Sequence, residues 1–182
     1  MIQSTRRLLI RPLSTADAGD FFAYRSDPQV FKFQSSHFQS LEDARALIQS
    51  MEGRTFGKRG EWVQLAIKHL ADEKVVGDIG LKPEGHDERV VEVGVSLAKP
   101  YQGQGIAKEA LRAVISSLFQ DHAVHRVLGY IDVENAPSIA LFESLGFRRE
   151  GHTLQSFCNK GVWRDEYLYA VLGSEWSEGK AE

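Results

Sequence analysis

The sequence lacks the features that mark several specialised protein classes. It has a single cysteine, Cys158, among its 182 residues. No disulfide can therefore form within the chain, which favours a reducing compartment. No apolar run approaches the about 20 residues of a membrane span, and the stretch 8–10 is too short for a signal peptide. We expect a cytoplasmic protein with no membrane partner.

An excess of charge of either sign is also missing. The formal net charge is −3 and the sequence pI is about 6.1, so bulk charge gives no reason to expect a nucleic-acid partner. The histidines are scattered without metal-ligand spacing, and we expect no metal. They are His37, His69, His86, His122, His125 and His152.

The composition that is present is that of an ordinary globular domain. Hydrophobic residues make up 42% of the chain and charged residues 26%. The length fits one domain better than two. We assign residues 1–176 to a single domain and expect residues 177–182 to be a disordered tail.

Hydrophobic periodicity and turn residues predict alternating strands and helices. Ser14 with Asp17 resembles a capping box, Pro28 is expected to end the first helix, and Ser40 is expected to cap the second. The predicted strands are 6–13, 61–70, 74–83, 89–97 and 125–133, followed by two final strands, the last at 166–172; the helices are 14–28, 40–51, one that follows Gly105, and 136–147. This order predicts an α+β domain with a mixed, mostly antiparallel sheet of about seven strands and about four helices.

The segment PYQGQGIAKEAL, residues 100–111, places Gly103 and Gly105 between a strand and a helix. Unpaired N–H groups and the positive end of the helix dipole make such a junction an anion site. A P-loop needs a Lys-Ser or Lys-Thr pair at the end of its glycine pattern, and a dinucleotide fingerprint needs a third glycine where Lys108 stands. The sequence therefore predicts an anion site of another kind.

A second strand-to-helix junction follows at residues 135–147, NAPSIALFESLGF. Asn135 is suited to cap a helix that Gly146 ends, with Phe142 and Phe147 as core residues. Together the two segments resemble the GNAT acetyltransferase superfamily: QGQGIA fits its acetyl-CoA loop and NAPSIALFESLGF fits its following helix. Within the superfamily the chain looks most like the RimJ/RimL-type branch, from LLIRPL, VEVGVSL, GFRREG and VWRDEYLYAVL.

This resemblance implies acetyl-CoA as cosubstrate. The amides of residues 103–107 would hold the pyrophosphate, and pantetheine would lie along the fourth strand, which splays from the fifth. A backbone N–H near Leu97 would stabilise the oxyanion of the tetrahedral intermediate. The residues expected to bind the cofactor are Val95, Ser96, Leu97, Gln102, Gly103, Gln104, Gly105, Ile106, Ala107, Asn135, Ser138 and Phe142.

The transfer needs a neutral amine, so a general base is useful. Glu92 is the candidate, since related enzymes often carry a glutamate on this strand; the alternative is an ordinary solvated glutamate. Asp132, Glu150 and Asp165 are further alternatives. We expect direct transfer in a ternary complex, with Cys158 a lone strand cysteine and not a covalent carrier.

The CoA thiolate would be reprotonated in this superfamily by a tyrosine at the position of Phe142, and phenylalanine has no proton to give. Ser138, one helical turn earlier, can hydrogen-bond the thiolate; water is the alternative. The departure keeps open a non-catalytic acyl-CoA sensor, and a nucleotide-binding domain of unrelated function is a third reading.

The leading hypothesis is an acetyl-CoA-dependent N-acetyltransferase acting on a protein N-terminal α-amine or a small primary amine. In the superfamily the acceptor site is built by the first two helices, their loop and the last hairpin, residues 31–40 and 158–166 here. Those segments do not identify the acceptor. Either a monomer or a homodimer is compatible with the sequence.

Overall fold

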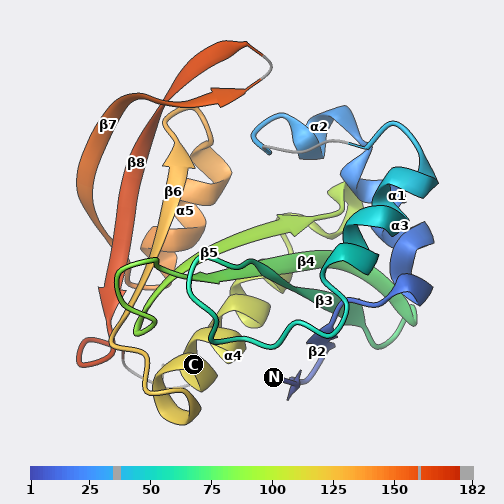
Figure 1. The fold of residues 1–182 in the computed structure, drawn as a ribbon, viewed down its shortest axis with the longest axis horizontal. Coiled ribbons are helices and arrows are strands. Elements are labelled where there is room, and N and C mark those ends of the chain that lie inside the picture. Colours follow the sequence, from blue (N-terminus) through green and yellow to red (C-terminus); the bar gives the residue numbers. More distant parts are fainter. Residues whose placement is uncertain (35–37, 160, 177–182) are drawn as a thin grey trace.

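The described part of the chain folds into one eight-stranded sheet with helices on both faces (Figure 1). The computed structural model describes residues 1–34, 38–159 and 161–176, so the expected tail at 177–182 lies outside the described residues. The strands are β1 Gln3–Ser4, β2 Leu8–Pro12, β3 Val63–His69, β4 Lys74–Pro83, β5 Val90–Leu97, β6 Arg126–Asp132, β7 Arg148–Asn159 and β8 Val162–Leu172. The α-helices are α1 Ala18–Arg25, α2 Pro28–Phe31, α3 Leu41–Ser50, α4 Ile106–Asp121 and α5 Ala136–Ser144.

The strand order is β1-β2-β3-β4-β5-β6-β8-β7, and every neighbouring pair is antiparallel except β5 with β6. The predicted α+β class and mixed, mostly antiparallel sheet are confirmed. The described residues hold one strand more than predicted, because the two-residue β1 pairs with β2. They also hold a fifth α-helix, α2.

The prediction that Pro28 ends the first helix is wrong. Helix α1 already ends at Arg25, and Pro28 begins α2, whose first N–H is capped by the Asp27 side chain, which accepts from Gln29 N. Proline is favoured in the first helical turn because its missing N–H has no partner there. At Ser40 the prediction is confirmed: Ser40 Oγ accepts from Asp43 N at 3.1 Å, and Asp43 accepts from Ser40 N at 3.0 Å.

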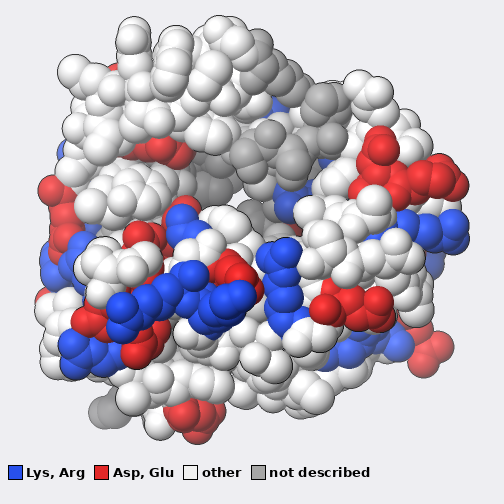
Figure 2. All heavy atoms as spheres, in the orientation of Figure 1, with Lys and Arg blue, Asp and Glu red and all other residues white. Residues whose placement is uncertain are grey.

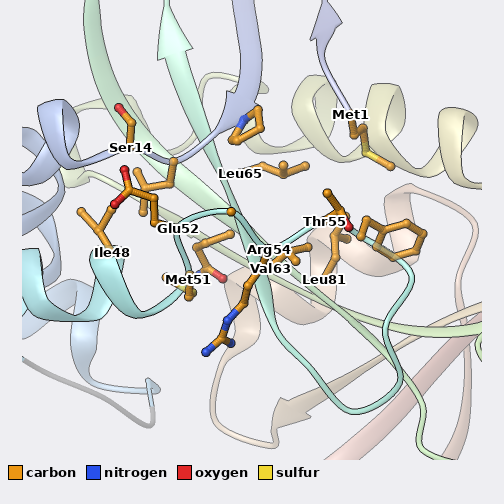
Figure 3. Close-up of a pocket in the computed structure, with 15 residues that line it drawn as sticks. Met1, Ser14, Ile48, Met51, Glu52, Arg54, Thr55, Val63, Leu65 and Leu81 are labelled. Carbon is orange, nitrogen blue, oxygen red and sulfur yellow. The ribbon is translucent and has the colours of Figure 1, made fainter.

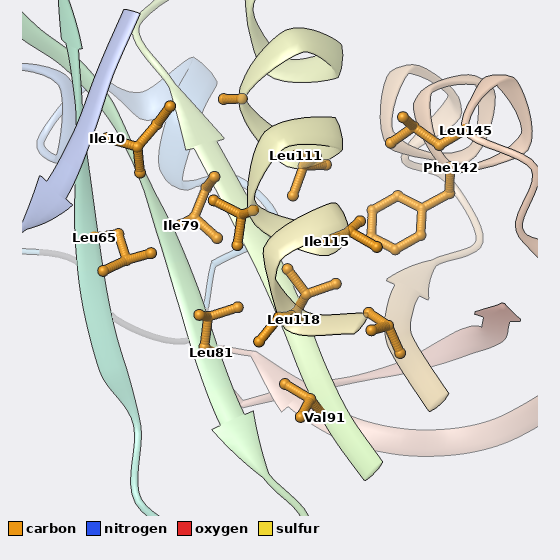
Figure 4. Packing of buried hydrophobic residues seen from close by; sticks show 14 of the residues in the cluster. Ile10, Leu65, Ile79, Leu81, Val91, Leu111, Ile115, Leu118, Phe142 and Leu145 are labelled. Carbon is orange, nitrogen blue, oxygen red and sulfur yellow. The ribbon is translucent and has the colours of Figure 1, made fainter. Parts of the chain in front are cut away.

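Each face of the sheet buries its own apolar cluster. One cluster packs α4 and α5 against strand residues such as Leu81, Val91 and Val93 (Figure 4). The other packs α1 and α3 against Ala66 and Val75. Side chains alternate between faces along each strand, so β5 sends Val91, Val93 and Val95 toward α4, and Glu92 and Ser96 to the opposite face. No helix in the described part of the chain is long and apolar enough to cross a membrane.

Strands β5 and β6 pair at one end and then diverge, as the resemblance implied. They pair only from Val90 to Glu92 on β5, opposite Arg126 to Leu128 on β6. Ala98 N donates to Val76 O on β4 at 2.8 Å, so alternation directs the backbone groups of Val95 and Leu97 the other way, toward β6. Beyond Glu92 these groups face a gap and not a neighbouring strand.

Candidate active site

A cavity of about 560 Å³ lies where β5 and β6 separate. Its walls come from α2 and the turn after it, the end of β5, the glycine loop with the first turn of α4, and α5. The lining residues are Gln29, Val30, Phe33, Gln34, Val95, Ser96, Leu97, Lys99, Tyr101, Gln102, Gly103, Gly105, Ile106, Ala107, Lys108, Asn135, Pro137, Ser138, Ala140, Leu141 and Ser144.

The glycine loop forms one end of this cavity. Gly103 and Gly105 have φ of 73° and 74°, a left-handed conformation that favours glycine, and Gly105 is the N-cap residue of α4. Gln102 Nε2 donates to Leu97 O at 2.8 Å, and Arg7 Nη1 donates to Gln104 O at 3.0 Å. The loop is therefore held from both sides, and the first N–H groups of α4 are available to an anion.

Two lysines add positive charge at this end, because Lys99 and Lys108 both line the cavity. Arg7, which donates to the loop, is held in turn by an ion pair: its Nε lies 2.7 Å from Glu109 Oε2. Burial raises the pKa of Glu109, but hydrogen bonds from Thr5 and Arg7 outweigh it and leave that pKa below its usual value. The carboxylate thus stays charged and keeps Arg7 against the loop.

Helix α5 forms the opposite wall. Asn135 Oδ1 accepts from Ser138 N at 3.3 Å and caps the helix, so Asn135 and Ser138 share the cavity edge. The turn before it is anchored by Arg164, which donates to both carboxylate oxygens of Asp132, at 2.7 and 3.0 Å. Burial would raise the pKa of Asp132, and the hydrogen bonds from Arg164 and from Glu134 N lower it overall.

The predicted cofactor-binding residues come together here, with two exceptions. All of them line the cavity except Gln104, whose Nε2 donates to Pro100 O, and Phe142. Phe142 is 3% exposed and packs with Phe147 and Tyr169, so the structure places it in the core and not at the cavity. Helix α5 turns this side chain toward the sheet, and its contact with the ligand stays a prediction.

The ring of Phe142 is buried and occupies the space that a side chain at Gly129 would need, so a tyrosine in its place has to bury its hydroxyl. A Cβ added to Gly129 would lie 2.9 Å from Cζ of the ring, the atom that carries the tyrosine hydroxyl. We predict that Phe142→Tyr destabilises the fold by about 1–3 kcal/mol and leaves kcat no higher. Thermal unfolding and thiol release measure the two effects, with Phe157→Tyr on half-buried β7 as the control. A faster Phe142→Tyr enzyme would show that the position is catalytic after all.

Glu92 lies on the sheet face opposite α4 and forms an ion pair with Lys82 on β4. It is not among the residues that line the cavity. Tyr130 and Glu166 share its surroundings: burial, and then the charges of Glu84 and Glu92, raise the pKa of Tyr130, and burial raises that of Glu166. Glu92 therefore belongs to a mixed group of ionisable side chains where the strands begin to separate.

The other carboxylates considered as bases have structural partners. Asp132 is held by Arg164, and Asp165 accepts from Gln155 N at 2.8 Å and lies 3.0 Å from His152 Nε2. Glu150 pairs with Arg126 and Arg148. Each of these carboxylates stabilises the β6–β8 region. Cys158 is exposed, and among the described residues no group of three or more His, Cys, Asp or Glu is placed to hold a metal.

A second cavity, of about 300 Å³, lies between the end of α3, the loop after it and strands β2 to β4 (Figure 3). Both methionines of the chain, Met1 and Met51, line it. None of the predicted site residues lines this second cavity.

The space-filling view shows the molecule hollowed between the β7–β8 side and the α1–α3 side, with Lys/Arg and Asp/Glu interspersed over this face (Figure 2).

Sequence reasoning missed the contribution of α2 to the cavity, whereas Phe33 and Gln34 belong to the segment 31–40 predicted to build the acceptor site. Gln29, Val30, Phe33 and Gln34 all line the cavity. The signal that could have found α2 is the Asp27-Pro28 pair, a cap followed by an N-terminal proline. The residues 35–37 of the predicted acceptor loop, with His37, lie outside the described residues.

Comparisons with known proteins agree with this architecture. The model of the acetyltransferase (GNAT) domain family matches residues 7–148. The N-acetyltransferase YnaD of Bacillus subtilis is 31% identical over 96% of this chain and 98% of its own length. The ribosomal protein uS5 alanine N-acetyltransferase of Escherichia coli is 32% identical, over 48% of this chain and 45% of its own.

Solved structures share the fold over nearly the whole chain. The acetyltransferase (GNAT family) from Bacillus anthracis matches with a TM-score of 0.84 and 29% identity, covering 96% of this chain and all (100%) of that one. The spermidine N-acetyltransferase of Vibrio cholerae, solved with CoA and spermine, matches with a TM-score of 0.80 and 19% identity, covering 94% and 99%. At that identity the likeness is one of fold.

Proposed function

Because this chain belongs to the GNAT acetyltransferase family and is an N-acetyltransferase, we propose that it moves the acetyl group of acetyl-CoA directly to a primary amine in a ternary complex. The observation that carries the proposal is the cavity between the separating strands β5 and β6. It joins a helix start suited to bind an anion to the edge of β5 where the backbone groups of Val95 and the N–H of Leu97 face the gap. CoA, with a pyrophosphate at one end and amides along its arm, has the matching chemistry.

In this proposal the amides of residues 103–107 hold the pyrophosphate, with Lys99 and Lys108 beside it. The amides of pantetheine pair with the backbone of Val95, which faces the gap. The Leu97 carbonyl already accepts from Gln102, which leaves the Leu97 N–H for the thioester oxygen. When bound, acetyl-CoA supplies the activated acyl group.

We propose Glu92 as the base that takes the proton of the attacking amine and Ser138 as the group that hydrogen-bonds the leaving CoA thiolate. Ser138 lines the cavity, which supports its role. Glu92 is on the side of the sheet away from α4, where it forms an ion pair with Lys82. Water remains the alternative proton source for the thiolate.

The acceptor is proposed as either a protein N-terminal α-amine or a small amine. The Escherichia coli relative is named for the first class and the Vibrio cholerae structure for the second. A second candidate function is an acyl-CoA-binding sensor without turnover, favoured by the absence of a tyrosine at Phe142. A cytoplasmic monomer or homodimer completes the proposal.

A thiol-release assay with an acceptor panel tests this function. We expect CoA release from acetyl-CoA in the presence of one class among peptides beginning with Ala, Ser or Met, polyamines and aminoglycosides. Calorimetry in parallel should show binding of CoA and acetyl-CoA in preference to ATP. Binding of acetyl-CoA with no release for any acceptor would favour the sensor, and preference for ATP would refute the proposal.

A further inference from the structure

Arg25, the last residue of α1, carries a buried guanidinium beside the cavity. It is 5% exposed. Nη1 donates to Ser96 Oγ at 3.0 Å and to Gln34 Oε1 at 2.8 Å. Nε lies 3.4 Å from Oδ1 of Asp78 on β4, which is 1% exposed. One cation thus joins α1, the turn after α2, and the strands β4 and β5.

The guanidinium itself is fixed in place. Asp78 Oδ1 also accepts from the Tyr24 hydroxyl at 2.7 Å, and Asp78 Oδ2 accepts from Gln64 Nε2. The Phe21 ring lies 5.4 Å from the Arg25 guanidinium carbon. These contacts hold the buried guanidinium against Asp78, Ser96 and Gln34, although its Nε has no hydrogen-bond partner among the described residues.

The direction of these hydrogen bonds decides what Ser96 and Gln34 present to the cavity. Arginine only donates, so Ser96 Oγ and Gln34 Oε1 are necessarily acceptors. The single hydroxyl proton of Ser96 and the amide protons of Gln34 therefore point away from Arg25. Both residues line the cavity. Arg25 in this way engages an oxygen of each of these two cavity-wall side chains and leaves their protons to donate elsewhere.

We propose that Ser96 and Gln34 donate hydrogen bonds to the carbonyl oxygen of the bound acyl thioester, and that Arg25 is the positioning residue for both. The inference rests on the proposed function. Ser96 is next to Leu97 on β5, where the thioester is proposed to lie, and Gln34 approaches from the turn after α2. The chain would then meet the acyl oxygen with two side-chain donors in addition to the backbone.

These donors act during transfer. The amine nitrogen bonds to the carbonyl carbon, and the π electron pair moves onto the carbonyl oxygen. Collapse of this intermediate breaks the C–S bond, with the pair leaving on the CoA sulfur, and the amine proton passes to the base. A donor aimed at the oxygen binds the charged intermediate more strongly than the neutral thioester, so it lowers the barrier.

Ser96→Ala tests the proposal and keeps both members of the Arg25–Asp78 ion pair, although it removes one acceptor of Arg25 Nη1. We expect kcat to fall about tenfold or more, with the KM for the acceptor changed less than about threefold. CoA has no acyl oxygen, so its affinity should stay unchanged while acetyl-CoA binds more weakly; calorimetry measures that ratio. The control is Ser117→Ala, a buried serine of α4 that donates to Asp121 away from the cavity.

Arg25→Lys and Gln34→Leu complete the test. If Arg25 acts through Ser96, the double variant Arg25→Lys, Ser96→Ala should be no slower than the slower single variant. Unchanged kcat and an unchanged acetyl-CoA to CoA affinity ratio in Ser96→Ala and Gln34→Leu would overturn the inference. A wild-type chain without transfer to any acceptor would refute the proposed function instead, so the two failures are distinguishable.

Discussion

Replacing Gly105 by valine should weaken binding of acetyl-CoA by about 100-fold or more, while the chain still folds. Gly105 has φ of 74°, where a β-branched residue is an outlier that costs about 1–3 kcal/mol. An added Cβ meets only Arg7 Nη2, at 3.6 Å, so the core is not disturbed. The strain falls on the loop that aims the first N–H groups of α4. Calorimetric titration with acetyl-CoA measures the loss.

Gly53→Val is the matched control for this prediction. Gly53 has φ of 76°, with nothing within 4 Å of an added Cβ, and it lies in the loop after α3, away from the proposed CoA site. Both variants carry the same backbone strain, so both should lose a similar amount of thermal stability. Acetyl-CoA affinity should fall in Gly105→Val alone. Normal affinity in that variant would mean that the glycine loop does not hold the ligand.

Glu92→Gln should lower kcat near pH 7 by about 100-fold or more, if Glu92 takes the proton of the amine. The variant should recover part of its rate as pH rises, because solvent then deprotonates the amine. For an α-amine, whose pKa is about 7.7–8.0, the recovery is expected near pH 8, and for an alkylamine of pKa about 10.4 it is expected near pH 10. The ratio of wild-type to variant rates should therefore shrink with increasing pH. A pH profile of kcat measures it and also indicates the acceptor class.

Glu84→Gln is the control for Glu92. The Glu84 carboxylate also lies near Lys82, 3.8 Å from Nζ, and Glu84 directly follows β4, so the variant removes an equal charge from the same surroundings. That variant should keep kcat within about threefold of the wild type. An equal fall of kcat in Glu92→Gln and Glu84→Gln would show that the rate depends on the negative charge around Lys82. It would not support a proton transfer at Glu92.

The parts of this molecule that could be predicted from sequence are those whose cause is local. Gly103 and Gly105 needed positive φ at a strand-to-helix junction, and the structure has it at both. Ser40 and Asp43 made their capping box because the interaction spans one helical turn. The separation of β5 from β6, in contrast, came from the family resemblance, since no local pattern states where two strands stop pairing.

The features that could not be predicted from the sequence depend on contacts between residues far apart in the chain. Arg25 reads as an ordinary helix-end arginine, and its contact with Ser96 joins residues 71 positions apart. Helix α2 is four residues long, too short to show a helical period. Phe142 illustrates a conflict between two inferences: its apolar character indicated core, the family position indicated ligand, and packing against Gly129 agrees with the first.

The most direct test of the account is to follow the acetyl group itself. The chain is incubated with acetyl-CoA labelled in the acetyl carbon and with the acceptor that gives thiol release, and mass spectrometry locates the label. Direct transfer predicts label on the acceptor amine, in equal amount to the CoA released, and none retained on the protein. Label held on exposed Cys158, or found only as free acetate, would contradict the account.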